Sequence, residues 1–490
     1  MIQRDLLTDP CWQGKDLGHP LPDSLHAVSV ALPRWRDVVA YEENDPSCRS
    51  RLRAVYPRFG FHPLVADLVG SVLETAGCPA GFQAWPYPTD AAAQAALAHC
   101  QRAAPDAEAR ILSKDQLRIL LTDAAASGAA KAFWQHAGLG VSSRQAAIAL
   151  SRATAPSPES GEQARALVRA RLNGIYNCGR DHISLHPSGM AALHSALLLV
   201  DALAPGRPTL QVGFPYVDVL KLPQVVFAGA ELLTDASATA IAAKLDELQP
   251  AAVVVELPSN PMLQCVDLIQ LSALAHDRGV VVIADDTIGS GVNIDALPYA
   301  DLVFSSLTKS FAGRGDVLAG ALVVSPFSRW HERFRSALTN APAALGDADA
   351  LVLEECSRDV LQRIPQLNDN CSALAERLQR HPAIQRVMHP TQCESFQALL
   401  RPGGGNGCLL SFELKGGQAE AERVYDALEV CKGPSLGTHF TLCCPYVLLA
   451  HYDELAWAAS CGVSAHLLRV SVGMEDPQQL WQRFERALAV

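Results

Sequence analysis

The chain has 490 residues and a formal net charge of −11, from 40 Lys and Arg against 51 Asp and Glu. Hydrophobic residues make up 49% of it and charged residues 19%, so it can bury a sizeable core, and wholesale disorder is excluded. The acidic balance argues against a nucleic-acid partner, and no apolar run reaches the roughly 18 residues that a membrane span needs. The N-terminus has no signal-peptide pattern and the 14 cysteines are scattered, which predicts a cytoplasmic protein with reduced thiols.

Changes of composition along the chain predict its organisation. We expect an N-terminal arm over 1–64, a helical insertion over 65–170, a large domain over 171–330 and a smaller C-terminal domain over 331–490. In the large domain, β-branched runs alternate with helix-like segments, which is typical of a mostly parallel sheet covered on both faces. The runs lie at 209–213, 251–257, 279–285, 301–306 and 320–325, and the helix-like segments at 189–203, 236–248 and 267–278.

The last part of the chain predicts a smaller α+β unit. Strand-like runs at 408–414 and 467–472 stand on either side of a helical stretch near 418–430. Asp476 followed by Pro477 is typical of the start of a final helix.

Two polar residues stand at the ends of predicted strands in the large domain. Asp285 ends the apolar run 280–284, and Lys309 follows the run 301–305. Ligands of open α/β sheets bind at the carboxyl edge of the strands, so both side chains can face one crevice. A lysine amine there can form a Schiff base with an aldehyde cofactor, and the carboxylate can hold a pyridine nitrogen protonated, which makes the ring an electron sink.

A rival motif is Gly433-Pro434-Ser435-Leu436-Gly437, which satisfies the GxSxG pattern of serine hydrolases. That pattern needs a strand before the serine and a helix after it. Here we expect a helix-like segment before Ser435 and an extended one after it, which opposes the hydrolase hypothesis.

The segments Asp285-Asp286-Thr287 and Ser306-Leu307-Thr308-Lys309 resemble the D-[ND]-T and S-x-T-K motifs of the cystathionine γ-synthase family, the Cys/Met-metabolism enzymes. The long fungal-type members resemble the chain further at 26–30, 56–59, 133–136 and 435–438. The resemblance implies an α/β chain of fold type I, the aspartate aminotransferase-like fold of transferases that depend on pyridoxal 5'-phosphate (PLP). That fold has a mostly parallel sheet and a smaller C-terminal α+β domain. It also implies a homodimer or homotetramer with a shared active site.

The resemblance assigns roles to the matching residues. Lys309 matches the Schiff-base lysine, Asp285 the partner of the ring nitrogen, and Tyr216 the aromatic that stacks on the ring. Arg469 matches the arginine that grips the substrate carboxylate bidentately, with Ser435 beside it. Further cofactor-binding residues that the resemblance implies, the first three at a helix start that suits an anion, are Ser188, Gly189, Met190, Asn260, Ser306 and Thr308.

One more pair concerns the cofactor phosphate. Tyr56 and Arg58 resemble the Y-x-R pair that reaches the phosphate of a neighbouring subunit. Arg144, in the segment 140–144, is the alternative to Arg58.

The implied activity is chemistry at the γ-carbon of an L-amino acid. The preferred hypothesis is γ-replacement, in which O-acyl-homoserine and cysteine give cystathionine. The alternative is a γ-elimination lyase, including one that turns a γ-halogenated amino acid into an alkyne, because Arg314 and Asp316 depart from the fungal pattern and change the charge close to Lys309. Phe440 stands where short bacterial members carry a glutamate, a loss that the fungal type shares.

The sequence leaves several points open. They are the leaving group, the role of the insertion, and the choice between a dimer and a tetramer. A silent cofactor-binding protein is the remaining alternative to an enzyme, and the presence of Lys309, Asp285 and Arg469 argues against it.

Overall fold

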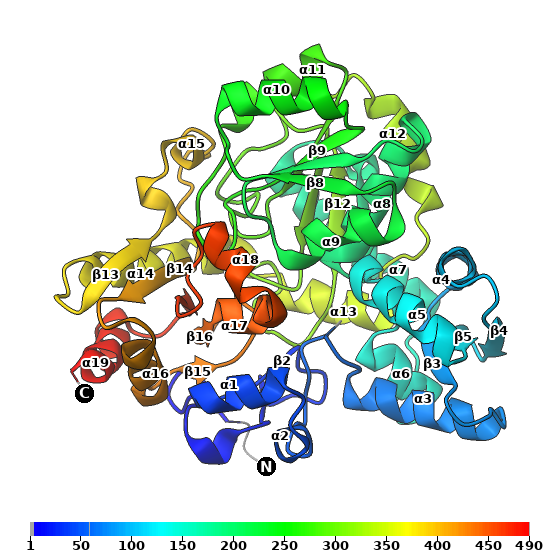
Figure 1. Cartoon of the computed structure of the whole chain (residues 1–490), viewed down its shortest axis with the longest axis horizontal. Helices are drawn as coiled ribbons and strands as arrows, with labels where there is room; N and C mark the ends of the chain where they lie inside the picture. Colours follow the sequence, from blue (N-terminus) through cyan, green and yellow to red (C-terminus); the bar gives the residue numbers. More distant parts are fainter. Residues whose placement is uncertain (1–3, 58, 490) are drawn as a thin grey trace.

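The apolar runs between residues 183 and 324 form a central sheet of seven strands, in the order β6-β12-β11-β10-β9-β7-β8. Figure 1 shows it in the computed structural model of the chain, which describes residues 4–57 and 59–489. The strands are β6 (Ile183–His186), β7 (Thr209–Val212), β8 (Ala230–Leu233), β9 (Ala252–Glu256), β10 (Val281–Asp285), β11 (Leu302–Ser306) and β12 (Gly320–Val324). The five strand-like runs predicted in this region are confirmed as β7, β9, β10, β11 and β12.

Because most neighbouring strands are parallel, the polar residues at their carboxyl ends lie along one edge of the sheet. The pairs from β8 to β11 are parallel, and β12 alone runs antiparallel to both of its neighbours, β11 and β6. The predicted mostly parallel sheet is therefore confirmed. The register of β10 against β9 sets Asp285 opposite Glu256, so two carboxyl groups end neighbouring strands.

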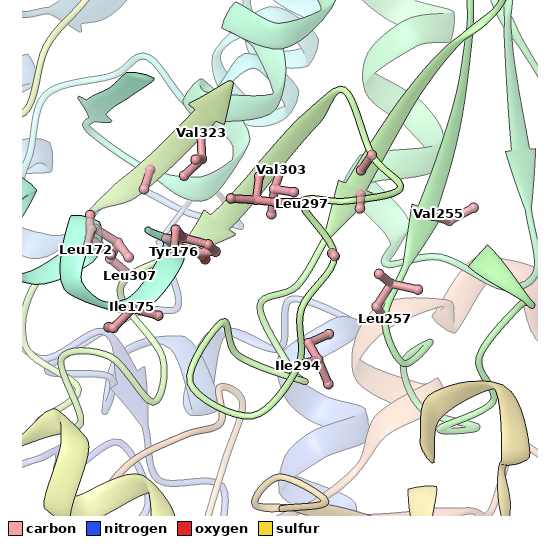
Figure 2. Close-up of a cluster of buried hydrophobic side chains, with 14 of the residues drawn as sticks. Leu172, Ile175, Tyr176, Val255, Leu257, Ile294, Leu297, Val303, Leu307 and Val323 are labelled. Carbon is pink, nitrogen blue, oxygen red and sulfur yellow. The ribbon is translucent and has the colours of Figure 1, made fainter. Parts of the chain in front are cut away.

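Both faces of the sheet are covered, which explains why the strands read as continuous apolar runs. Val253 and Val255 of β9 belong to one buried cluster, and Val254 belongs to the other. Figure 2 shows part of the first cluster, where Leu172 and Tyr176 lie among side chains of the strands. The helices of this region are α7 (Pro158–Tyr176), α8 (Gly189–Leu203), α9 (Val217–Val226), α10 (Ala238–Leu248), α11 (Leu268–Asp277) and α12 (His331–Ala337).

The C-terminal part forms its own sheet of five strands, in the order β13-β14-β17-β16-β15. The strands are β13 (Ile384–Met388), β14 (Leu409–Leu414), β15 (Cys431–Lys432), β16 (Leu442–Pro445) and β17 (Leu468–Ser471). The helices are α13 (Asp347–Cys356), α14 (Val360–Gln379), α15 (Glu394–Gln397), α16 (Gly417–Ala427), α17 (Tyr446–Ala450), α18 (Leu455–Ser460) and α19 (Pro477–Leu488). Asp476 caps α19, because its side chain accepts hydrogen bonds from the backbone N–H groups of Gln478 and Gln479.

The N-terminal arm docks on this C-terminal sheet. Its elements are β1 (Pro20–Leu21), β2 (Ser29–Val30), α1 (Trp35–Glu42) and α2 (Pro46–Arg49). Trp35 of α1 shares a buried cluster with Phe484 of α19, and the buried amine of Lys432 donates to the backbone oxygen of Pro33 at 3.0 Å. Figure 1 shows the arm in blue below the orange and red C-terminal elements. The end of the arm is thereby carried toward the central sheet of its own chain.

The region between the arm and the large domain holds a sheet as well as helices. Its elements are α3 (Pro63–Thr75), β3 (Gln83–Tyr87), α4 (Asp90–Ala103), β4 (Ala109–Lys114), β5 (Leu117–Thr122), α5 (Ala124–Ala137) and α6 (Ser143–Ala149). The strands form an antiparallel sheet in the order β3-β5-β4. The composition of the region hides them, because Pro86 interrupts one strand and charged residues such as Arg110 and Lys114 dilute another. Trp85 and Phe133 pack in the same cluster as Met190 of α8, which joins this region to the large domain.

The cysteines behave as small core residues, as predicted. All 14 are free thiols, and most are buried. None of the helices between residues 4 and 489 is both long and apolar enough to cross a membrane.

Candidate active site

A cavity opens at the carboxyl edge of the central sheet, where the large domain, the C-terminal sheet and the arm meet. It holds about 1070 Å³ of empty space, including its open mouth. The sequence-predicted residues that line it are Tyr56, Ser188, Gly189, Met190, Tyr216, Asn260, Asp285, Ser306, Thr308, Lys309, Ser435 and Arg469. Arg58 lies outside the described residues.

The amine of Lys309 stands at the centre of this arrangement. The side chain is only 8% exposed, and its Nζ donates hydrogen bonds to the hydroxyl of Tyr56 at 2.8 Å and to Oγ of Ser435 at 3.1 Å. The amine also lies 4.9 Å from the centre of the Tyr56 ring. One group from the arm and one from the C-terminal domain thus fix a lysine of the large domain.

Tyr56 reaches the lysine of its own chain. The docking of the arm explains this contact, because α1 packs on the chain's own C-terminal sheet and the following segment enters the chain's own cavity. That this tyrosine serves a neighbouring subunit, as the resemblance implies, stays a prediction. The expectation of a homodimer or homotetramer stays a prediction.

Ser435 holds a strained backbone position. Its φ of +87° lies in the left-handed region, which costs a residue other than glycine about 1–3 kcal/mol. Its carbonyl oxygen accepts a hydrogen bond from Nη2 of Arg469 at 2.7 Å, while its hydroxyl accepts one from Lys309. Both contacts keep the serine in this conformation and orient its hydroxyl toward the amine.

Asp285 and Glu256 place two buried carboxyl groups side by side on the cavity wall. Oδ1 of Asp285 accepts a hydrogen bond from the Thr287 N–H at 2.9 Å, and burial raises the pKa of Asp285 to about 7. Oε2 of Glu256 accepts from the N–H groups of Tyr216 at 3.1 Å and Asn260 at 3.0 Å. Burial, and then the charge of Asp285, raise the pKa of Glu256 well above its ordinary value. A cationic group brought to this wall would favour ionisation of Asp285.

Glu256 is a cavity residue that no sequence motif marks. The signal for it is a carboxylate that ends the apolar strand Ala252–Glu256, in register with Asp285. The second carboxylate of the Asp285-Asp286-Thr287 motif behaves differently. Asp286 accepts a hydrogen bond from the Tyr176 hydroxyl at 2.7 Å and does not line the cavity, so only the first carboxylate of the motif faces it.

The start of α8 forms the opposite end of the cavity. Ser188 caps this helix, because its Oγ accepts from the Ala191 N–H at 3.0 Å while donating to the backbone oxygen of Gly138 at 2.9 Å. A Cβ on Gly189 would come within 2.8 Å of Cβ of Ser306, so only glycine lets the helix start lie this close to the end of β11. The helix N-terminus and the hydroxyl of Ser306 therefore form a site that suits an anion. Thr308 also lines the cavity, and its hydroxyl donates to the backbone oxygen of Ala319 at 3.3 Å.

These groups fit PLP, which carries an aldehyde, a ring nitrogen and a phosphate. Lys309 offers an amine to the aldehyde, and the buried carboxyl group of Asp285 offers an acceptor to a protonated ring nitrogen. The start of α8 offers N–H groups to the phosphate. The chemistry of the donor set and the empty space between its members agree with this cofactor.

Arg469 is a buried cation on the same cavity. It lies in β17 and is 5% exposed. Its Nη1 donates to Oδ1 of Asn260 at 3.2 Å, and its guanidinium carbon lies 4.7 Å from the ring centre of Tyr446. Tyr446 also lines the cavity and was not singled out in the sequence.

Arg144, the alternative to Arg58, lines a second cavity. Its Nη1 donates to the backbone oxygen of Asp316 at 2.8 Å and to Oδ1 of Asp349 at 3.2 Å. Ser188 lines both cavities, so the cavity of Arg144 adjoins the helix start that suits the phosphate. Because Arg58 lies outside the described residues, the choice between the two arginines stays open.

The side chains of Arg314 and Asp316 lie outside the main cavity. Arg314 pairs with Glu355 at 2.7 Å on an exposed part of the surface, and Asp316 lies 3.8 Å from the guanidinium of Arg144. Neither residue lines the cavity of Lys309. Asp316 lines the second cavity, which shares Ser188 with that of Lys309, so the effect of these two charges on the reaction stays a prediction.

The serine hydrolase hypothesis fails on the geometry around Ser435. The short strand β15 precedes the motif, where a helix-like segment was expected, and no helix follows Ser435 before β16 begins at Leu442. A nucleophile elbow needs that helix. In this structure the serine hydroxyl instead accepts a hydrogen bond from Lys309.

Fold and site together define an enzyme of the PLP-dependent fold type I. The profile of the Cys/Met metabolism PLP-dependent enzymes matches residues 160–489, and the chain belongs to this family. A cystathionine gamma-synthase of Neurospora crassa is 30% identical, over 97% of this chain and 98% of its own length. The L-2-amino-4-chloropent-4-enoate dechlorinase/desaturase of Streptantibioticus cattleyicolor is 33% identical, over 96% and 97%. The crystal structure of a methionine gamma lyase from Micromonospora echinospora is 31% identical with a TM-score of 0.56, and the match covers 65% of this chain and 84% of that one.

Proposed function

We propose that this enzyme replaces the γ-substituent of an activated L-amino acid, such as an O-acyl-homoserine, with an amino thiol such as cysteine. The observation that carries the proposal is the meeting of the Lys309 amine, the Asp285 carboxyl group and the Arg469 guanidinium on one cavity. Similarity to cystathionine gamma-synthases and to a dechlorinase supports chemistry at the γ-carbon.

Different residues of the chain serve proton transfer, positioning of the amine and substrate binding. When bound, PLP supplies an electron sink for the electrons that proton loss at the α-carbon leaves behind. Nζ of Lys309 takes that proton and returns protons later, and the hydroxyls of Tyr56 and Ser435 hold the amine in position. Arg469 binds the substrate carboxylate and so fixes the orientation of the α-carbon.

Glu42 favours replacement over elimination. It ends α1 at the cavity mouth, and its carboxylate has no hydrogen bond or ion pair with the residues that the structure describes. Burial raises the pKa of Glu42 to about 7. A partly buried carboxylate at the mouth suits the ammonium group of a second, incoming amino acid, which an elimination does not need.

Elimination is the second candidate, and alignment length favours it. The dechlorinase aligns with the chain over 491 positions, whereas the Neurospora crassa synthase needs 613. The chain is therefore closer in length to a relative whose name describes loss of chlorine.

A paired assay tests the proposal. Purified enzyme receives O-acetyl-homoserine with and without cysteine, and products are measured by mass spectrometry. Cystathionine that forms only with cysteine, without keto acid, supports replacement. Equal release of keto acid with and without thiol would reject it in favour of elimination.

Glu42→Gln should weaken the use of cysteine selectively. We expect KM for cysteine to rise roughly three- to tenfold, because a partly buried ion pair is lost. KM for 3-mercaptopropionate, which is cysteine without its amino group, should not change. Because the pKa of Glu42 is raised to about 7, the advantage of cysteine over 3-mercaptopropionate should shrink as the pH falls below 7. Steady-state kinetics with both thiols measure these values.

The matched control for this variant is Glu43→Gln. Glu43 is exposed, accepts a hydrogen bond from Tyr452 and does not line the cavity, so both thiols should behave as in the wild type. Equal effects of Glu42→Gln on the two thiols would contradict an ammonium site.

A further inference from the structure

Tyr446 carries a buried hydroxyl that lacks a partner. The residue begins α17 directly after β16, is 4% exposed and lines the cavity of Lys309. Its Oη makes no hydrogen bond to any residue in the described part of the chain. A buried polar group left unpaired destabilises the protein, so a ligand that supplies a partner would recover that cost.

A second buried donor without a partner belongs to the group that packs on Tyr446. The Nε of Arg469 makes no hydrogen bond to the described residues, although Nη1 and Nη2 are held by Asn260 and Ser435. The guanidinium carbon lies 4.7 Å from the Tyr446 ring centre, which is a cation–π contact. Two open donors, one O–H and one N–H, thus belong to two side chains in contact on one cavity.

The charge around these donors favours the binding of an anion. Arg469 has no ion pair within the described ranges, since both partners of its Nη atoms are neutral oxygens. The nearby Glu256 does not supply a firm counter-charge, because burial raises its pKa well above the ordinary value. A buried cation without a carboxylate partner is costly, and a bound carboxylate would remove the cost.

We propose that Tyr446 is a substrate-binding residue whose hydroxyl, together with Arg469, holds the α-carboxylate of the amino-acid substrate. The inference rests on the proposed function, because it requires an amino acid in the cavity. Tyr446 then contributes a hydrogen bond to a charged group, and its ring keeps the guanidinium flat beside the carboxylate.

The test uses Tyr446→Phe, which keeps the ring and removes only the hydroxyl. Calorimetry with the holoenzyme measures the binding of L-norvaline, which has no leaving group and no side-chain acceptor, and of pentanoate, which is norvaline without its amino group. We expect Kd to rise about tenfold or more for both ligands, as befits a lost hydrogen bond to a charged group. Tyr452→Phe, whose hydroxyl contacts Glu43 away from the cavity, should leave both Kd values unchanged.

Each other outcome has one meaning. If wild-type holoenzyme binds both ligands and Tyr446→Phe binds norvaline equally well, the hydroxyl does not touch the carboxylate and the inference is overturned. If only norvaline binding weakens, the hydroxyl serves the amino group, which also overturns it. If the wild type binds neither ligand, the proposed function itself fails. Thermal unfolding of the variant holoenzyme within about 2 °C of the wild type shows that folding does not explain the result.

Discussion

Lys309→Ala is expected to lower kcat by about 10⁴-fold or more, since a positioned base alone contributes up to that factor and, in the proposed function, the same amine also attaches the cofactor. The amine holds its place through Tyr56 and Ser435, and an alanine leaves these two hydroxyls without it. The anion site at the start of α8 stays intact, so the variant should still bind PLP noncovalently. Steady-state kinetics and the visible spectrum after borohydride treatment and gel filtration measure both effects.

Two further variants sharpen this prediction. Lys309→Arg keeps the positive charge but cannot give up its proton near neutral pH, so it should be as inactive as Lys309→Ala. Lys221→Ala removes a lysine that pairs with Glu454 outside the cavity, and it should be fully active. Turnover above a tenth of the wild-type rate in Lys309→Ala would show that another group is the base.

The sequence predicts those site residues whose position follows from the strand directly before them in the chain. Asp285 and Lys309 each follow a continuous apolar strand, and parallel strands bring such ends to one edge of a sheet. The two residues indeed line one cavity. Regular strands and helices of the large domain were predicted for the same reason, because burial on both faces leaves an unbroken apolar run.

The residues that the sequence does not predict depend on how distant segments dock. Glu42 and Tyr446 belong to short helices whose sequences show no chemical motif, and they meet only because α1 packs on the C-terminal sheet. The same docking turns Tyr56 toward its own Lys309. Contacts between segments about 400 residues apart leave no periodic pattern in the sequence. They can therefore be found only from the folded structure.

Asp285 illustrates the cost of building this site. Its pKa rises from the ordinary value of 3.8 to about 7 on burial in the absence of a cationic partner. Since the folded state then binds the proton more tightly than the unfolded state, stability of the cofactor-free protein falls as the pH rises from about 4 to about 7. A shift of this size corresponds to at most about 4 kcal/mol. The positive ring nitrogen of bound PLP would offset this cost.

Asp285→Asn should therefore stabilise the cofactor-free protein and inactivate the enzyme. The amide can still accept the Thr287 hydrogen bond through its oxygen, but it has no charge to bury. We expect the melting temperature of the cofactor-free variant to exceed that of the wild type, by a margin that grows between pH 4 and pH 7. We also expect PLP to raise the melting temperature of the variant by less than that of the wild type.

The same substitution, Asp285→Asn, should lower the catalytic rate although it raises stability. Without a carboxylate for the ring nitrogen, we expect kcat to fall by about 10³-fold, within the range that one preorganised electrostatic contact supplies. Asp286→Asn provides the matched control, because that carboxylate contacts Tyr176 away from the cavity and its loss should change kcat little. A cofactor-free Asp285→Asn protein that melts below the wild type at pH 7, or that turns over substrate normally, would mean that Asp285 serves the fold rather than the ring. We therefore expect Asp285→Asn to raise the melting temperature of the cofactor-free protein and to lower kcat. A buried group that serves function shows both effects, whereas removing one that serves packing lowers stability.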